Sequence, residues 1–378
     1  MAGQTVRTRA KRFWLRITEG MQLNELWQQF RADARSSYRL YSLEIDSTRG
    51  TEVRGARRFF NIAGQFFWAV VEKLSPARRV LLVLALVLLI IPVADWGWGF
   101  RSGEVHGNAP NLHFIGGVLM FALLVMEVGD RVVMKRDLQI AKEIQAWLLP
   151  AAPPHVPGLD IAFATRPANT VAGDYYDVFP RPASDGEKTF LIAIADVAGK
   201  SVPAALLMAT FQASLRTLSG MPGPLTGLVG SINRYACSNS QNGRRFTTAF
   251  IAEYFPAQRR LIYVNAGHNS PILLRRSGAV ERLGCGGMPL GILDCAPYEA
   301  GEVTLETGDW LAAFTDGVIE AENNSQQQYG EDRLLVMLRW GTGLPPSVLL
   351  RALVADINRF AGDVPQHDDI TCMLVRAL

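Results

Sequence analysis

The chain has 378 residues, of which 49% are hydrophobic and 19% charged, and its formal net charge is +3. This length allows more than one domain, and the nearly balanced charge gives no indication of nucleic-acid binding. The four cysteines form no CxxC pair and have no histidines at metal-ligand spacing, which argues against a disulfide framework or a zinc site and favours reduced thiols in a cytosolic domain.

Residues 1–79 form the first region, and their pattern is helical and amphipathic. Within 57–74, aromatic side chains and cations recur at helical spacing, which suits a membrane surface. Packing of this helix on the rest of the protein is an equally good interpretation. No catalytic constellation is present, so we predict a cytoplasmic helical region.

Two apolar runs follow, at about 80–98 and 111–129. Each is close to the roughly 20 apolar residues that a helix needs to cross a bilayer. Trp96 and Trp98 near the end of the first run suit a membrane interface. A buried core helix is the alternative for each run, but two runs so close together favour a transmembrane hairpin over 80–130.

Cations on either side of the hairpin indicate its orientation. Both flanks are rich in lysine and arginine, whereas the connecting loop carries only Arg101 as such a residue. The positive-inside rule therefore places both flanks in the cytoplasm and the loop outside. The flanking cations are Arg54, Arg57, Arg58, Lys73, Arg78 and Arg79 before the hairpin and Arg131, Lys135 and Arg136 after it.

Residues 131–150 are predicted to form a linker helix, which ends at a group of prolines beginning with Pro150. Val133, Ile140, Ile144 and Trp147 fall near one face of this helix. This stripe suggests a signalling helix that pairs across a homodimer. An ordinary amphipathic helix packed on the next domain is the alternative.

Residues 155–378 have the size of one domain, and their pattern is rich in strands. Apolar runs predict strands at 189–196, 309–316 and 368–376, and helical spacing predicts a helix over 203–218. Two further strand-like runs, 247–255 and 260–267, are joined by a short connection and predict a hairpin.

Acidic residues recur where these strands meet turns. They are Asp174, Asp196, Asp316 and the adjacent pair Asp368 and Asp369. If they gather at one end of a sheet, their charges repel and require a counter-charge. Oxygen ligands select magnesium or manganese over zinc, so the pattern predicts a divalent-cation site.

Six motifs occur in order along this region: AGDYYDVF, ADVAGKSVPAALLMA, NAGHNSPILL, GMPLGI, FTDGVIEA and DDITCMLV. Together they resemble the bacterial phosphoserine phosphatases of the SpoIIE/RsbU type, within the metal-dependent PP2C-like superfamily. The resemblance covers nearly all of 135–378. It implies an α+β fold, an α-β-β-α sandwich of two antiparallel sheets flanked by helices. It also implies two divalent cations, Mn²⁺ or Mg²⁺.

The resemblance assigns roles by motif. Asp196 resembles the carboxylate that bridges the two metals, and Asp196 and Asp316 would act in catalysis through a metal-activated water that attacks phosphorus. The implied metal ligands are Asp174, Asp196, the Val197 carbonyl, Asp316 and Asp368, with Asp369 assisting. Asp177, the second acid of AGDYYD, is equally well explained as a ligand or as a turn residue.

Two further residues are candidates for phosphate binding or proton transfer. Arg166 lies eight residues before Asp174 and is a candidate phosphate contact, with a solvated arginine as the alternative. His268 is a candidate general acid, with an ordering role in a turn as the alternative. The sequence departs from the family where Ala172 and Ser201 replace common glycines, and neither change removes a ligand.

The resemblance implies a protein serine/threonine phosphatase in the bacterial cytoplasmic membrane, a multi-pass protein with its phosphatase domain in the cytoplasm. The implied substrate is a phosphorylated STAS-type anti-sigma-factor antagonist, which would make the protein part of sigma-factor signalling. Regulation would pass through the hairpin and the linker helix. Two other functions stay open: a membrane-anchored pseudophosphatase that only binds a partner, and a lipid or small-molecule phosphohydrolase.

Overall fold

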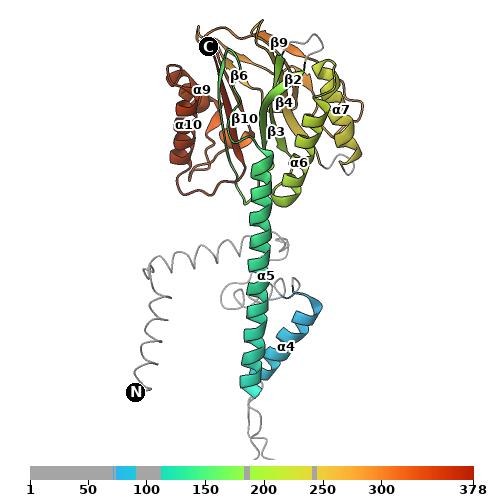
Figure 1. Cartoon of the computed structure of the whole chain (residues 1–378). Helices are drawn as coiled ribbons and strands as arrows, with labels where there is room; N and C mark the ends of the chain where they lie inside the picture. Colours follow the sequence, from blue (N-terminus) through green and yellow to red (C-terminus); the bar gives the residue numbers. More distant parts are fainter. Residues whose placement is uncertain (1–70, 72–73, 91–111, 183–187, 241–244) are drawn as a thin grey trace, which may run out of the picture. The chain divides into compact units, whose positions relative to one another are not determined.

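The computed structural model describes residues 71, 74–90, 112–182, 188–240 and 245–378 (Figure 1). The chain divides into two compact units, residues 1–131 and 132–378. Apart from residues 71 and 74–79, the predicted N-terminal helical region lies outside the described residues. The end of the first predicted span, with Trp96 and Trp98, and the loop that follows it also lie outside them.

In the first unit, α4 (Pro76–Ile90) contacts the beginning of α5 (Leu112–Leu148). A Cβ added at Gly116 would lie 3.0 Å from the Leu89 side chain, and Arg78 Nη1 lies 2.5 Å from Asp130 Oδ2. Residues early in α4 thus meet residues late in this part of α5, so the two helices run antiparallel.

Among the described residues, α5 is the one helix long and apolar enough to cross a membrane. Its most apolar window has a mean hydropathy of 2.0 and is 6% buried. The described part of α4 has 15 residues, short of the roughly 20 needed for a span. The structure therefore shows one candidate membrane span where the sequence predicts two. Because α5 is continuous, the second apolar run and the predicted linker belong to one helix.

The second unit contains two sheets. The first has the order β1-β11-β10-β6-β7, with bounds Leu159–Arg166, Ile370–Ala377, Trp310–Phe314, Ile272–Leu274 and Val280–Arg282. The second has the order β2-β3-β4-β5-β8, with bounds Tyr175–Pro182, Lys188–Val197, Thr247–Phe255, Arg260–Ala266 and Gly286–Gly287, and β9 (Gly301–Thr304) also pairs with β5. The short β8 runs parallel to β5, while the other pairings are antiparallel.

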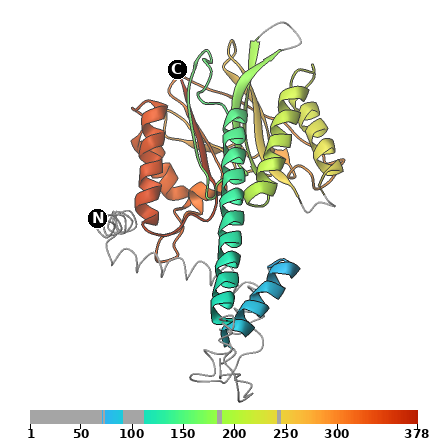
Figure 2. The same cartoon turned by 60° about the horizontal axis from the view of Figure 1, so that its bottom comes forward.

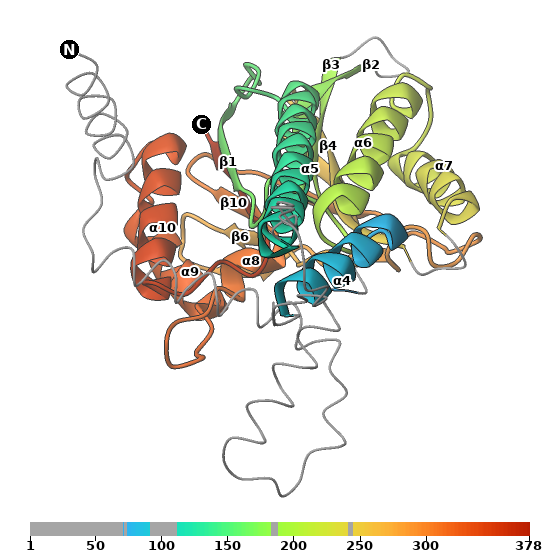
Figure 3. The same cartoon turned by 90° about the horizontal axis from the view of Figure 1, so that it is seen from below.

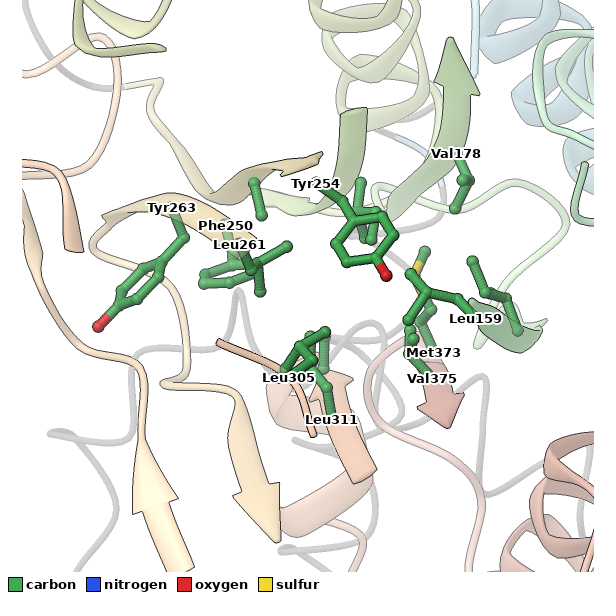
Figure 4. Packing of buried hydrophobic residues seen from close by; sticks show 14 of the residues in the cluster. Leu159, Val178, Phe250, Tyr254, Leu261, Tyr263, Leu305, Leu311, Met373 and Val375 are labelled. Atoms are coloured by element: carbon green, nitrogen blue, oxygen red, sulfur yellow. The ribbon is translucent and has the colours of Figure 1, made fainter. Parts of the chain in front are cut away.

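Alternation of side chains along the strands builds the core between the sheets. On β3, Ile192 and Ile194 point into the space between the sheets, while Leu191 points to the opposite face. Tyr176 and Tyr175 divide in the same way, so these neighbours face opposite sides of β2. Figure 4 shows the packing between the sheets, where side chains from both sheets meet.

Helices cover the outer face of each sheet. The sheet that contains β3 is covered by α6 (Ser201–Leu218) and α7 (Leu225–Ser238). The other sheet is covered by α8 (Asp316–Ile319), α9 (Gly330–Trp340) and α10 (Pro346–Ala361). Figures 2 and 3 show α6 and α7 on one side of the sheets and α9 and α10 on the other. The predicted α-β-β-α sandwich is confirmed.

The predicted elements of this unit are present with small shifts at their ends. The strand predicted at 189–196 is β3, and the predicted hairpin is formed by β4 and β5. The helix predicted over 203–218 begins two residues earlier, at Ser201, whose φ of 65° lies in the left-handed region. A residue with a Cβ is strained there by about 1–2 kcal/mol, whereas glycine is not.

We therefore expect Ser201→Gly to stabilise the protein. Relief of the left-handed strain outweighs the greater freedom of glycine in the unfolded chain, which leaves a net gain of about 0.5–1 kcal/mol. The free energy of unfolding in urea measures this change. Ser201→Ala is the control, because alanine keeps the Cβ and the strain. Equal stabilities of the glycine and alanine variants would contradict the expectation.

Candidate metal centre

The acids predicted from the sequence come from corresponding ends of paired strands. Asp174 precedes β2 and Asp196 is near the end of β3, and these strands pair antiparallel with Tyr175 opposite Ala195. Asp316 follows β10, and Asp368 and Asp369 precede β11, with Phe314 opposite Cys372. Antiparallel pairing puts the end of one strand beside the start of the next, so each sheet carries its acids at one end of its strands.

Hydrogen bonds join the acid-bearing strand ends of the two sheets. The Gly173 backbone N–H donates to Asp369 Oδ2 at 2.7 Å, and the Thr315 hydroxyl donates to Asp174 Oδ2 at 2.9 Å. Both bonds cross from one sheet to the other. The Asp369 N–H also donates to Asp368 Oδ1 at 2.9 Å. Asp196 lies close enough to Asp174, Asp316, Asp368 and Asp369 for their charges to interact. These five acids, here called the carboxylate cluster, are Asp174, Asp196, Asp316, Asp368 and Asp369.

Close backbone approach at two glycines allows this assembly. A Cβ at Gly173 would lie 3.1 Å from the Val197 carbonyl oxygen and 3.2 Å from the Cβ of Ala204. A Cβ at Gly317 would overlap the carbonyl oxygen of Asp369. Side chains at either position would push the turns of the carboxylate cluster apart. The glycine of AGD therefore packs directly against the turn that carries the Val197 carbonyl.

The carboxylate cluster carries more negative charge than the neighbouring cations and hydrogen-bond donors neutralise. Burial, followed by the charge of Asp196, raises the pKa of Asp174 well above its usual value. Burial, followed by the charge of Asp316, raises the pKa of Asp196 to about 7. Burial also raises the pKa of Asp316 and Asp369, and the charge of Asp368 adds to both shifts. Like charges at a shared site favour the protonated form until a cation balances them.

The chemistry of these donors fits hard divalent cations. All the side-chain donors are carboxylate oxygens, the ligands that Mg²⁺ and Mn²⁺ prefer. Among the described residues, no three His, Cys, Asp or Glu side chains are arranged to hold one metal ion. The fit therefore rests on donor type and on the convergence of these acids, and not on a preformed set of three ligands.

Lys200 is a cationic neighbour of the cluster that the sequence analysis did not single out. Its Nζ lies 3.1 Å from Asp368 Oδ2 and donates to the His367 carbonyl at 2.6 Å. Its positive charge favours the ionised forms of Asp196 and Asp316 and so opposes the rise of their pKa. Lys200 lies in the ADVAGKS motif, four residues after Asp196, and this position was the only signal available.

A cleft of about 430 Å³ opens beside the cluster. Lys200, Asp368 and Arg166 line it, together with Asn358 and Glu320. Arg166 donates to the Asn358 side chain. The predicted phosphate contact therefore lies in the same cleft as Asp368 and the ammonium of Lys200.

Asp177 is separate from the cluster. Its carboxylate is fully buried and accepts hydrogen bonds from the Tyr175 hydroxyl at 2.6 Å and from Arg216 Nε at 2.8 Å. The Arg216 guanidinium also lies over the Phe179 ring, 4.0 Å from its centroid. These partners bind Asp177 to the outer side of β2 and to α6. The contacts explain why one acid of AGDYYD joins the carboxylate cluster and the other does not.

His268 is buried beside Thr248 of β4, which lies opposite Asp196 of β3. Its Nδ1 lies 3.0 Å from the Thr248 hydroxyl, which also donates to the Asp196 carbonyl at 3.4 Å. Burial lowers the pKa of His268 to about 4, so its imidazole is neutral at pH 7. A neutral imidazole is a poor proton donor, and the link to Asp196 passes through Thr248.

The fold and the carboxylate cluster define residues 132–378 as a PP2C-like α+β unit. Residues 186–378 match the family model described as Stage II sporulation protein E (SpoIIE), and the chain belongs to the SpoIIE family. Phosphoserine phosphatase RsbU of Bacillus subtilis is 30% identical over 203 residues, covering 52% of this chain and 57% of RsbU. Protein IcfG of Synechocystis is 27% identical over 279 residues, covering 67% of this chain and 43% of IcfG. The chain thus spans about half the length of these relatives.

Solved structures show the same fold. The SiaA-PP2C domain of Pseudomonas aeruginosa superposes with a TM-score of 0.56 at 24% identity, covering 65% of this chain and 98% of that domain. A structure of RsbU and RsbW domains from Mycobacterium tuberculosis gives a TM-score of 0.50 at 21% identity, covering 60% of this chain and 63% of that chain.

The electrostatics predict that Asp196→Asn stabilises the metal-free protein at neutral pH. The folded state raises the pKa of Asp196 from its usual value to about 7, so folded protein binds more protons than unfolded protein between about pH 4 and 7. The destabilisation from Asp196 therefore grows as pH rises through this window. In EDTA, we expect the variant to melt higher by about 2–4 °C at pH 7.5, or roughly 1 kcal/mol, and by less at pH 5.

Calorimetry with and without Mn²⁺ checks this prediction. Saturating Mn²⁺ should stabilise the natural protein more than the variant, which reverses their order of melting. Asp332→Asn, which removes an exposed carboxylate from α9, is the control and should change neither order nor midpoint appreciably. A variant that melts below the natural protein in EDTA at pH 7.5 would contradict the raised pKa of Asp196.

Proposed function

We propose that the chain is a metal-dependent protein serine/threonine phosphatase that hydrolyses a phosphorylated side chain with water. The observation that carries the proposal is the convergence of carboxylates from both sheets, joined by the bonds from Gly173 to Asp369 and from Thr315 to Asp174. Membership of the SpoIIE family and the similarity to RsbU, a phosphoserine phosphatase, support the same activity.

The carboxylate cluster would hold two divalent cations, Mn²⁺ or Mg²⁺. When bound, such ions lower the pKa of a water and neutralise charge on the phosphoryl oxygens. Asp196 and Asp316 are the residues on which catalysis depends most, through the site that they form. The proposed ligands are Asp174, Asp196, the Val197 carbonyl, Asp316 and Asp368, with Asp369 assisting through its fixed position beside Gly173.

Lys200 and Arg166 are the proposed phosphate-facing cations. Both line the cleft beside Asp368, so a phosphorylated side chain entering the cleft meets positive charge next to the cluster. Lys200 offers a mobile ammonium, and Arg166 offers a planar group that suits phosphate oxygens. For His268 we propose an orienting role through Thr248, because a neutral imidazole does not readily protonate a leaving group at pH 7.

The proposed substrate is a phosphoserine or phosphothreonine on a STAS-type anti-sigma-factor antagonist. The family resemblance and the similarity to RsbU support it. We further propose that the protein resides in the bacterial cytoplasmic membrane, with residues 132–378 in the cytoplasm. The apolar window of α5 and the cations Arg131, Lys135 and Arg136 that follow it support this placement. The antiparallel contact of α4 with α5 supports the second pass.

We also propose a homodimer through the linker part of α5. Its apolar stripe consists of Val133, Ile140, Ile144 and Trp147, and all four side chains are exposed, Trp147 to 81%. Positions separated by three and four residues along a helix form the seam of a coiled coil. A second copy of the same stripe would bury these side chains, and regulation from the membrane would then act through the paired helices.

Asp196→Asn and Asp316→Asn test the activity. Each should lower Mn²⁺-dependent hydrolysis of a phosphoserine protein by more than about a hundredfold, because loss of even an outer partner of a metal ligand costs about 10- to 100-fold. Asp332→Asn should keep the natural rate. Turnover that persists in both cluster variants would exclude the dimetal mechanism.

The same assay separates the alternatives. The full chain is compared on a phosphoserine protein, on p-nitrophenyl phosphate and on phosphatidic acid in vesicles. Faster hydrolysis of the lipid than of the protein would favour a lipid phosphohydrolase. Mn²⁺ binding with no hydrolysis of any substrate would favour a pseudophosphatase.

Ile144→Asp tests the dimer. A charge in the middle of the paired stripe should dissociate the full-length protein in detergent, which light scattering after gel filtration measures as a halved protein mass. Lys142→Asp, an exposed change off the stripe on the same helix, should leave the mass unchanged. A natural protein that is monomeric at the concentrations used would overturn the proposed dimer.

A further inference from the structure

Near the end of α5, a polar side chain is buried while neighbouring apolar side chains are exposed. Gln145 is 7% exposed, whereas its neighbours Ile144 and Trp147 are 48% and 81% exposed. Amphipathic helices normally bury their apolar face and expose glutamine. A buried polar side chain among exposed apolar ones indicates that its contacts are specific.

Gln145 makes both of its hydrogen bonds to one residue. Its Nε2 donates to the Ala172 carbonyl at 2.7 Å, and its Oε1 accepts from the Ala172 N–H at 3.0 Å. Ala172 is 1% exposed and lies outside the strands, so its backbone groups need partners other than water. The glutamine amide supplies one donor and one acceptor in a single plane, which match the C=O and the N–H of the single residue Ala172.

Ala172 begins the turn that reaches the carboxylate cluster. The next residue, Gly173, donates to Asp369 Oδ2 at 2.7 Å and packs against the Val197 carbonyl. The residue after that, Asp174, is held by Thr315. Asp174 of the carboxylate cluster is therefore only two residues along the chain from Ala172, whose backbone Gln145 binds.

The end of α5 is also held in the domain by Leu149, which packs against both the core between the sheets and the core beneath α6. Gln145 lies one helical turn before it, so its amide is at the point where α5 joins the domain. A shift of α5 along its axis by one helical turn, about 5.4 Å, would break both bonds to Ala172. The contact is therefore either made or broken.

We propose that Gln145 is a positioning residue that couples α5 to the metal site, by holding the 172–174 turn where Asp174 and Asp369 can act together. The inference rests on the proposed function, because it assigns to Gln145 the control of the same site. Retention of both hydrogen bonds keeps the turn ordered and cation affinity high. Loss of the bonds frees the turn and weakens cation binding, and this gives α5 a route to regulate the enzyme.

The test uses the full-length chain in nanodiscs with Gln145→Glu and Gln145→Ala. Glutamate keeps the size and one acceptor but places a second acceptor against the Ala172 carbonyl. Alanine removes both bonds. Gln139 is an exposed glutamine on the same helix, so Gln139→Glu and Gln139→Ala are the matched controls.

Two measurements are made without substrate. Calorimetric titration should show Mn²⁺ binding weakened about tenfold in both Gln145 variants and unchanged in the Gln139 variants. Hydrogen exchange in EDTA should be faster over 168–174 in the Gln145 variants only. At saturating Mn²⁺, the Gln145 variants should recover most of their kcat with an unchanged KM, which a general loss of structure would not allow.

Natural Mn²⁺ affinity and natural exchange over 168–174 in both Gln145 variants would overturn the proposal. If the alanine variant does not fold, as judged by circular dichroism, the glutamate variant decides. Failure of the proposed function is distinguishable, because a chain that binds Mn²⁺ through Gln145-dependent order but hydrolyses no phosphoester would refute the phosphatase and leave the coupling intact.

Discussion

Repulsion among the five acids of the carboxylate cluster is the constraint on which the rest of the domain depends. Burial, followed by the charges of the neighbouring carboxylates, disfavours ionisation and raises the pKa of Asp196 to about 7. Backbone hydrogen-bond donors offset part of this repulsion. The Asp369 carboxylate accepts from the N–H groups of Ala168 and Gly173, each at 2.7 Å. These bonds fix one acid in place while the cluster as a whole still requires a cation. Rigid sheets make this possible, because they hold the strand ends together against the repulsion.

The helix α6 connects this site to a second buried charge. Its first turn begins beside Lys200, whose ammonium contacts Asp368, and near its end Arg216 pairs with the fully buried Asp177. The Asp177 carboxylate is fully buried and the Arg216 side chain is 43% exposed, so removal of Arg216 would leave the buried carboxylate without this positive partner. The pair therefore anchors the end of α6 to β2, at the opposite end of the helix from Lys200. The acid that does not join the cluster thus holds the helix that starts beside it.

The helix α5 has two different surfaces after residue 131. The exposed stripe that ends at Trp147 suits a second copy of the chain, while the single amide of Gln145 is directed into the domain. A rotation of α5 about its axis changes both surfaces at once, because they belong to one rigid helix. In the proposed dimer, a change in the pairing of the helices would therefore reach Ala172 without any contact between the stripe and the cluster.

The sequence by itself determined several strands of the sandwich, while the sandwich as a whole was implied by the family resemblance. Apolar runs located β3, β10 and β11, a short connection located the β4–β5 hairpin, and the order of six motifs placed the acids at strand ends. It also determined that Tyr175 and Tyr176 face opposite sides, because side chains alternate along any strand. These are local properties, and periodicity over a few residues is enough to predict them.

Only the tertiary structure decided which polar residues act together. It separated Asp174 from Asp177 through their partners Thr315 and Arg216, which lie 141 and 39 residues away. It placed Lys200 against Asp368 and Gln145 against Ala172, and it buried His268 away from solvent. No local pattern predicts such contacts, because each depends on the packing of segments far apart in the chain. The sequence therefore predicted a divalent-cation site, and the tertiary structure showed which residues belong to it.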